Sequence, residues 1–215
     1  MVTLSLIALW YQALFVIAPD RDQGEVYRLI YVHVPMAFAA FVCAFILFWH
    51  SIRSVRSASE ASLRSARASA EVGLIFTVLT LATGSIWGHP VWGTWWTWDA
   101  RLTTTFILAL LYAGYLAFYS ATPPSPQRTR ACSVIGILIF VDIPIIYKSV
   151  TWWRTLHQPP TLMRPGGSTI DPDMRNLLIS CVAAVVIVAV LLVRARSQNL
   201  ELSDALEDET YRRMQ

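Results

Sequence analysis

Charged side chains are scarce in this chain: Asp, Glu, Lys and Arg make up 14% of its 215 residues, whereas hydrophobic residues make up 55%. Because a water-soluble domain carries roughly a quarter charged residues, this composition indicates a membrane protein. The small net charge of +3 is spread over the ends of apolar segments. It forms no basic stripe with interleaved aromatic residues, so the pattern of a nucleic-acid-binding protein is absent.

Cysteine is equally rare. Cys43, Cys132 and Cys181 each lie alone in an apolar segment or at its end, as small buried hydrophobic residues do. The sequence contains no Cys-x-x-Cys-His motif for covalent haem attachment, no cysteine pair and no Walker motif. We therefore expect that this chain carries no covalently attached haem and performs neither thiol–disulfide exchange nor ATP hydrolysis.

Long apolar segments are what the sequence has instead. A helix rises 1.5 Å per residue, so about 20 apolar residues cross a hydrocarbon core of about 30 Å. Residues 53–69, rich in Arg, Ser and Ala, are expected to form an exposed loop, with helical extensions as an open alternative. No basic segment precedes the first apolar run, which favours a retained helix over a signal peptide. The pattern predicts six membrane spans, at about 3–19, 28–51, 71–86, 102–121, 131–150 and 176–193.

An even number of spans places both termini on one side of the membrane. Ten of the 17 Lys and Arg residues fall in the loop 53–69, the loop that contains Arg128 and the tail from Arg194. By the positive-inside rule, these segments are predicted to be cytoplasmic. We accordingly expect residues 1–196 to form one membrane domain and residues 197–215 to form an exposed cytoplasmic tail without a motif.

Tryptophan is concentrated in one stretch, predicted as a structured loop over residues 87–101. Gly88, Pro90 and Gly93 argue against a single helix there. Indole rings are costly to expose to water, so their concentration indicates a broad apolar surface that faces either a membrane boundary or a flat ligand. The stretch contains Trp87, Trp92, Trp95, Trp96 and Trp98.

Three stretches of the chain resemble one known family. GSIWG at 84–88 and WGTWWTWDARL at 92–102 resemble the tryptophan-rich WWD domain of haem-handling membrane proteins. YVHVP at 31–35 and WWRTLHQP at 152–159 resemble the two other signatures of the cytochrome c maturation protein C family, often called haem exporter protein C. The resemblance covers most of residues 25–180.

The resemblance implies an all-α integral membrane protein with six transmembrane helices and a tryptophan-rich periplasmic loop. It also implies that His33 and His157 are the axial ligands of noncovalently held haem b, beside the tryptophan platform. Arg28 and Arg101 each stand next to a signature and suit the haem carboxylates, although both also fit as ordinary interface anchors. Asp99 is expected to cap the following helix, to orient Arg101, or to contact a partner protein.

Four titratable residues allow more than one interpretation. By position alone, His33 fits either a satisfied interfacial histidine or a functional group within a span. His89 lies within the tryptophan stretch and is geometrically a third candidate ligand, but the family more often has lysine there, and it is interpreted as a variable loop residue. His50, at the cytoplasmic end of its helix, is interpreted as an interface residue. Asp142 lies within the fifth span, where a charge is functional by default, but its role is left open.

The implied function is delivery of haem to a periplasmic haem chaperone in cytochrome c maturation, without enzymatic activity. The implied location is a bacterial inner membrane, with the mitochondrial inner membrane as the alternative. The implied partners are haem, membrane lipid, that chaperone, ABC-type ATP-binding and membrane subunits and a small single-span protein.

Two other functions compete with haem delivery. A haem exporter subunit that moves haem across the bilayer is the main alternative, but the sequence has neither an internal repeat nor a discontinuous helix pair. An intramembrane redox enzyme with two haems needs two axial ligands for each iron, and among the histidines only His33 is placed well within a span.

Overall fold

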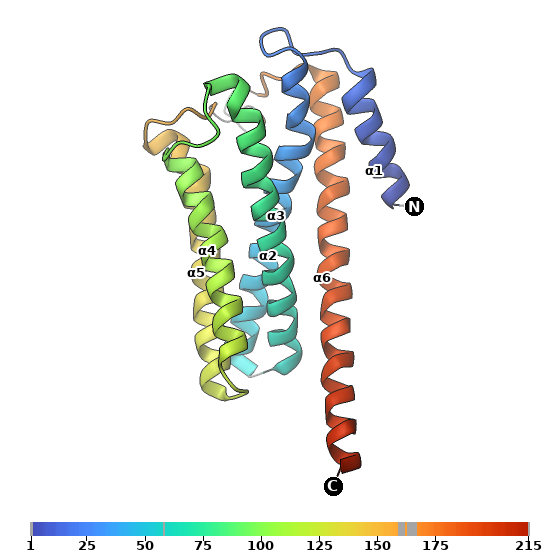
Figure 1. The fold of residues 1–215 in the computed structure, drawn as a ribbon, viewed down its shortest axis with the longest axis vertical. Helices are drawn as coiled ribbons and strands as arrows, with labels where there is room; N and C mark the ends of the chain where they lie inside the picture. The colour runs from blue at the N-terminus through green and yellow to red at the C-terminus, as the bar shows by residue number, and fades with distance from the viewer. Residues whose placement is uncertain (1, 58, 159–161, 163–166, 215) are drawn as a thin grey trace.

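The computed structural model describes residues 2–57, 59–158, 162 and 167–214, and these residues form a bundle of helices (Figure 1). Helix α1 (Val2–Tyr11) continues into a π-helical turn, η1 (Gln12–Val16), and the 3₁₀ turn η2 (Glu25–Leu29) leads into α2. The long helices are α2 (Ile30–Ser57), α3 (Glu60–Trp92), α4 (Ala100–Ala121), α5 (Pro126–Trp152) and α6 (Pro172–Met214).

Helices α2 to α6 are five segments long and apolar enough to cross a membrane. The first predicted span is a shorter apolar helix, Leu4–Val16, because the backbone becomes extended at Ile17 (ψ 143°). Large apolar side chains lie exposed around the bundle, including Phe45, Ile75 and Leu138, as contact with lipid requires. The prediction of an all-α membrane protein with about six helices is thereby confirmed.

Residues 53–69 do not form one exposed loop but follow the open alternative of helical extensions, since α2 continues to Ser57 and α3 already begins at Glu60. Ser59 caps α3 by accepting a hydrogen bond from the Ser62 N–H at 3.3 Å. Leu63 and Ala66 are then buried in the bundle core. Ala and Ser residues at helical spacing form a face of this segment that packs in the bundle. In the sequence, the arginines on its other positions suggested an exposed loop instead.

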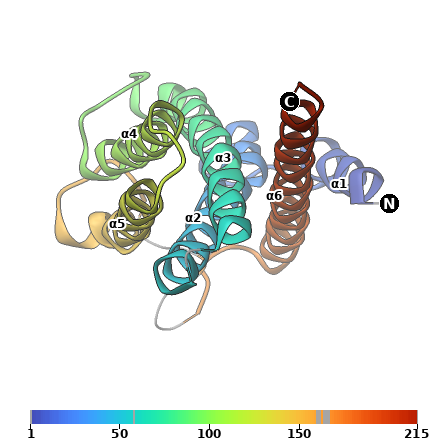
Figure 2. The same cartoon turned by 90° about the horizontal axis from the view of Figure 1, so that it is seen from below.

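Helix α2 is the central element of the bundle and contacts α3, α5 and α6. Seen along the bundle, α2 and α3 lie between the α4/α5 pair and α6, with α1 beside α6 (Figure 2). Glu71 of α3 forms an ion pair with Arg196 of α6 and a second with Arg67 at 2.9 Å. This pairing fixes α6 against the rest of the bundle.

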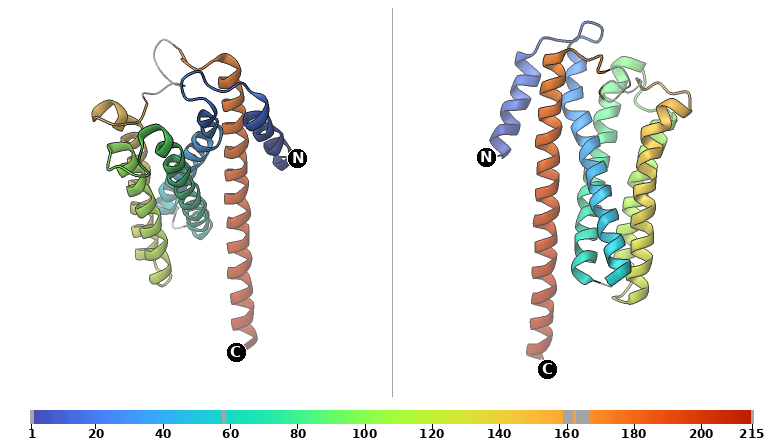
Figure 3. Two further views of the ribbon diagram at one scale, coloured as in Figure 1. Left: turned by 45° about the horizontal axis from the view of Figure 1, so that its top comes forward. Right: turned by 180° about the vertical axis from the view of Figure 1, so that it is seen from behind.

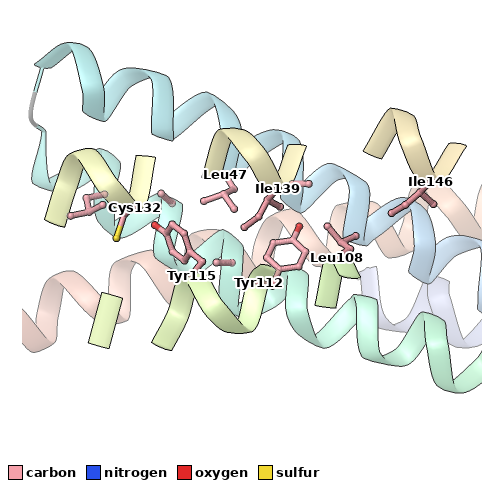
Figure 4. Packing of buried hydrophobic residues seen from close by; sticks show 11 residues of the cluster. Leu47, Leu108, Tyr112, Tyr115, Cys132, Ile139 and Ile146 are labelled. Carbon is pink, nitrogen blue, oxygen red and sulfur yellow. The ribbon is translucent and has the colours of Figure 1, made fainter. Parts of the chain in front are cut away.

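Tyr112 joins three helices in the core (Figure 4). Its ring is fully buried, and its hydroxyl donates to the Ala40 carbonyl oxygen of α2 at 3.1 Å. A Cβ at Gly73 of α3 would lie 2.5 Å from that ring. Glycine at this position is therefore what allows α4 to approach α2 and α3 so closely. Cysteines 43, 132 and 181 are buried and unpaired, as the sequence predicted.

Helix α6 extends beyond the other helices at its C-terminal end (Figure 3). Arg64 pairs with Glu201 at 3.6 Å and with Asp204 at 3.4 Å, so α3 supports the first part of this extension. The predicted tail continues the helix of the last span to Met214. Its described side chains are exposed from Glu201 onward, whereas Leu200 is buried in the bundle. No structural break marks residue 196.

The two ends of the bundle differ in the connections they carry. The α2–α3 and α4–α5 connections lie at the end toward which α6 extends (Figure 1). The opposite end carries the η1–η2 connection, the loop 93–99 and the segment that follows α5 (Figure 1). We call this second end the tryptophan end. The tryptophan stretch and the His33 and His157 motifs thus lie at the same end of the bundle, where they line one cavity.

Candidate functional site

The tryptophan stretch is helical in its first part, which corrects the predicted loop 87–101. Helix α3 continues through Gly88 and Pro90 to Trp92 and ends at Gly93, whose φ is +73°. Gly88 is needed for packing and not for a turn, because a Cβ there would lie 2.8 Å from the Trp92 ring. Only residues 93–99 form a loop before α4 begins at Ala100.

A cavity of about 580 Å³ opens among α2, α3, α4 and α5 and reaches the tryptophan end. This volume falls within the range of about 300–1,000 Å³ that small-molecule sites occupy. Its deeper wall is apolar and includes Phe41, Leu108 and Phe140. Of the residues predicted as a haem site, five line it: His33, Trp87, Trp92, Arg101 and His157.

His33 stands in the first turns of α2 against α3. Its Nδ1 lies 3.0 Å from the Thr83 hydroxyl oxygen, and that hydroxyl donates its own hydrogen to the Leu79 carbonyl oxygen at 2.7 Å. The Thr83 oxygen therefore accepts from Nδ1–H, which leaves Nε2 of a neutral imidazole with its lone pair free. The Trp87 ring meets the imidazole edge-on, with ring centroids 5.8 Å apart. A Cβ at Gly84 would lie 3.0 Å from the imidazole Cε1.

His157 lies in the segment that follows α5, and Asp99 holds it in place. The imidazole Nδ1 lies 3.3 Å from Asp99 Oδ2, and the backbone N–H of His157 donates to the Thr155 hydroxyl oxygen at 3.1 Å. Trp92 packs against the imidazole at a centroid distance of 4.9 Å. Because one polypeptide segment carries His157 and another carries Asp99 and Trp92, the ring orientation depends on the docking of these two segments.

Asp99 has both carboxylate oxygens in hydrogen bonds. Oδ1 accepts from the Leu102 N–H at 2.8 Å and so caps α4, which is one of the three predicted roles. Oδ2 accepts from the Thr155 hydroxyl at 2.5 Å. Burial alone would raise the pKa of Asp99, but the hydrogen bonds from His157, Leu102 and Thr155 outweigh burial and hold that pKa well below its usual range. The side chain is therefore a carboxylate at neutral pH.

The structure separates the two predicted arginines. Arg101 lines the cavity, donates to the Tyr147 carbonyl oxygen at 3.4 Å and has a buried Nε with no partner among the described residues. A buried guanidinium donor without an acceptor suits an anionic ligand group. Arg28 instead pairs with Glu25 and donates to the Ala13 carbonyl oxygen at 2.8 Å, and it does not line the cavity.

The other three tryptophans of the stretch, Trp95, Trp96 and Trp98, lie outside the cavity lining. Trp95 is 58% exposed and stacks on His89 at a centroid distance of 4.2 Å, while Trp98 is 73% exposed. Trp96 packs edge-on against Trp98 and Phe106. The predicted platform thus has an inner part, Trp87 and Trp92, and an outer part at the surface.

The structure also places the histidines and the intramembrane carboxylate that had open interpretations. His89 is not a cavity residue. His50 lies roughly 25 Å along α2 from His33, at a rise of 1.5 Å per residue. Asp142 is buried in α5, outside the cavity lining, and its Oδ2 has no partner within the described part of the chain. Pro159 and Arg164 lie outside the described residues.

Sequence reasoning missed the residues that support the two histidines. Thr83 and Gly84 precede Trp87 by about one helical turn, so all three share one face of α3, and this spacing was a readable signal. Gln23 also went unnoticed, although its Oε1 accepts from the Trp87 indole N–H at 3.0 Å. Nothing in the local sequence around Thr155 indicated its contact with Asp99.

Comparison with known proteins gives consistent results. The family model described as "Heme exporter protein C" matches residues 1–211. "Heme exporter protein C" from Bradyrhizobium diazoefficiens is 36% identical over 214 residues, covering 95% of this chain and 80% of that protein. The protein of the same name from Escherichia coli strain K12 is 40% identical over 191 residues, covering 85% of this chain and 74% of that protein.

A third relative comes from a plant. A ccmC-like mitochondrial protein of cytochrome c biosynthesis from Marchantia polymorpha is 37% identical over 158 residues. The match covers 74% of this chain and 67% of that protein.

Proposed function

The chain belongs to the haem exporter protein C family of membrane proteins, which handle haem for cytochrome c maturation, and on that premise we propose that it holds haem b noncovalently in the cavity at the tryptophan end. It then passes this haem to a periplasmic haem chaperone. The protein acts by binding and release, without an enzymatic reaction.

The observation that carries this proposal is the pair of histidines in one cavity. His33 and His157 come from distant parts of the chain, yet both line the same cavity. Each imidazole has a partner at Nδ1, Thr83 for His33 and Asp99 for His157, so each leaves Nε2 for iron. Two neutral imidazoles form a ligand set that haem iron accepts.

The rest of the cavity suits the other parts of a haem. Trp87, Trp92 and the apolar deeper wall match the flat, hydrophobic porphyrin. A propionate needs a cation when it is buried, and Arg101 has an unpaired donor in the cavity wall. Arg28 has its donors engaged elsewhere, so we assign the propionate contact to Arg101.

Delivery requires a surface that the haem chaperone, called the carrier below, can reach. Trp95 and Trp98 are exposed and belong to the loop 93–99 at the tryptophan end, which the cavity also reaches. We assign them to chaperone contact. The distribution of Lys and Arg favours an orientation in which this end faces the periplasm of a bacterial cell and both termini are cytoplasmic, and we include that orientation in the proposal. ABC-type ATP-binding and membrane subunits and a small single-span protein would complete the assembly.

Absorbance spectroscopy of the purified protein tests the proposal. We expect no more than one haem per chain, with the spectrum of iron held by two histidines, and no haem movement into sealed vesicles that contain this chain alone. Transport by the isolated chain would favour the alternative function, a haem exporter. Purified protein that binds no haem under any loading condition would contradict both functions.

Single tryptophan substitutions should separate the inner from the outer part of the platform. Trp92→Phe is expected to lower haem occupancy several-fold, because Trp92 lines the cavity and packs against His157. Trp95→Phe and Trp98→Phe are expected to retain haem but to slow its transfer to the carrier. Haem content and transfer are measured at equal protein level in the membrane. Tryptophans of a membrane belt tolerate Phe, so full transfer by the Trp92, Trp95, Trp96 and Trp98 variants would make the stretch such a belt.

A further inference from the structure

The groups that are hydrogen-bonded to the two histidines differ in charge. His157 has its Nδ1 at 3.3 Å from a carboxylate oxygen of Asp99, whereas His33 has its Nδ1 at 3.0 Å from the neutral hydroxyl of Thr83. A carboxylate partner fixes the tautomer and orientation of a ligating imidazole and raises the basicity of its other nitrogen, and a hydroxyl does this less. The two nitrogens offered to the iron are therefore unequal donors.

Asp99 is also tied to the His157 segment by more than one bond. Oδ2 accepts from the Thr155 hydroxyl at 2.5 Å and from the Leu156 N–H at 3.3 Å, besides its contact with His157. Oδ1 is fixed by the first turn of α4. The side chain of Asp99 is only 7% exposed, so water competes little for these contacts. One carboxylate thus sets the position of the segment and the orientation of the ring together.

We propose that Asp99 is a positioning residue that makes His157 the stronger of the two haem ligands and leaves His33 as the ligand that is exchanged during delivery. In that exchange the bond between the iron and His33 Nε2 breaks, and a donor atom of the carrier forms the replacing bond without a change of oxidation state. This inference rests on the proposed function.

A double-mutant cycle tests the coupling between Asp99 and His157. Asp99→Asn keeps the size of the side chain and the capping of α4, since Asn caps helices as well as Asp, but it removes the charge. Losing an outer-shell partner typically costs 10–100-fold in affinity, so we expect haem affinity to fall about 10- to 100-fold. We also expect the reduction potential of the bound haem to become more positive. In the His33→Ala background the same loss should appear, whereas in the His157→Ala background Asp99→Asn should change nothing further.

Two comparisons complete the design. His157→Ala is expected to lower haem affinity more than His33→Ala does, and Asp99→Asn should narrow that difference. Ser125→Ala removes the cap of α5, whose hydroxyl accepts from the Arg128 N–H at 3.1 Å at the end of the bundle away from the cavity. This control is expected to lower thermal stability while haem affinity and potential stay unchanged.

The outcomes separate failure of the inference from failure of the proposed function. An equal effect of Asp99→Asn in both histidine backgrounds, or an unchanged potential, would show a structural role for Asp99 and overturn the inference. A His157→Ala protein that keeps full haem affinity and the two-histidine spectrum would instead overturn the proposed ligand pair.

Discussion

His33→Ala and His157→Ala are each expected to remove most of the haem that co-purifies with the protein and to abolish the two-histidine spectrum. Both side chains line one cavity and each presents Nε2 as the free nitrogen. Removing a ligand is expected to lower haem affinity by more than the 10–100-fold that follows from removing an outer-shell partner. Haem content per chain, measured by absorbance at equal protein concentration, gives the result directly.

His89→Ala and His50→Ala are the matched controls for this prediction. His89 stacks on Trp95 outside the cavity lining, and His50 lies several turns along α2 from His33. Both variants should keep haem content and spectrum close to those of the wild type. Loss of haem in His89→Ala alone would show that the ligand pair is wrongly assigned.

His33→Ala is also expected to reduce the amount of carrier that co-purifies with the protein. A noncovalently held haem with two imidazole ligands leaves only when a ligand is exchanged, so the carrier must engage the haem while this protein still holds it. Haem and carrier should then strengthen each other's binding by the same factor. Coupling free energies of about 1–3 kcal/mol correspond to about 5- to 150-fold, so carrier recovery should fall by a factor in that range in the haem-free variant.

Co-purification of the carrier with wild type, His33→Ala and His50→Ala protein measures this coupling. The His50→Ala protein should recover as much carrier as the wild type. Equal carrier recovery by His33→Ala protein that has lost its haem would show that the two proteins dock independently. If the coupling holds, energy from the ATP-using partner is needed for release of the loaded carrier and not for haem capture.

The spans were predictable because hydropathy reports burial in lipid directly, whereas helix ends depend on packing that the sequence does not display. Gly88 and Pro90 suggested a break, but the Trp92 ring covers Gly88 and the helix continues to Gly93. The arginines of residues 53–69 suggested a loop, but Leu63 and Ala66 pack into the core. A contact within α3 in the first segment, and packing of α3 into the bundle core in the second, outweighed local propensity.

The candidate site likewise contains residues that were predictable from the sequence and residues that were not. The motifs pointed to His33, His157 and Arg101, and all three line the cavity. Of the supporting residues, Asp99 was predicted and Thr83 had a readable spacing to Trp87, but Thr155 was not predictable, because its role depends on which segment faces it. Arg28 also stands beside a motif, but its side chain donates to the Ala13 carbonyl oxygen, pairs with Glu25 and does not line the cavity.

The cavity is built from two parts of the chain that lie far apart in sequence, so one part is synthesised well before the other. Helices α2 and α3 supply His33 and its support, while α4, α5 and the segment carrying His157 come later in the chain. At about 5–20 residues per second, His157 is synthesised on the order of ten seconds after His33. In the proposed site, haem can therefore be held between both imidazoles only after the segment that follows α5 has been synthesised and has docked on Asp99.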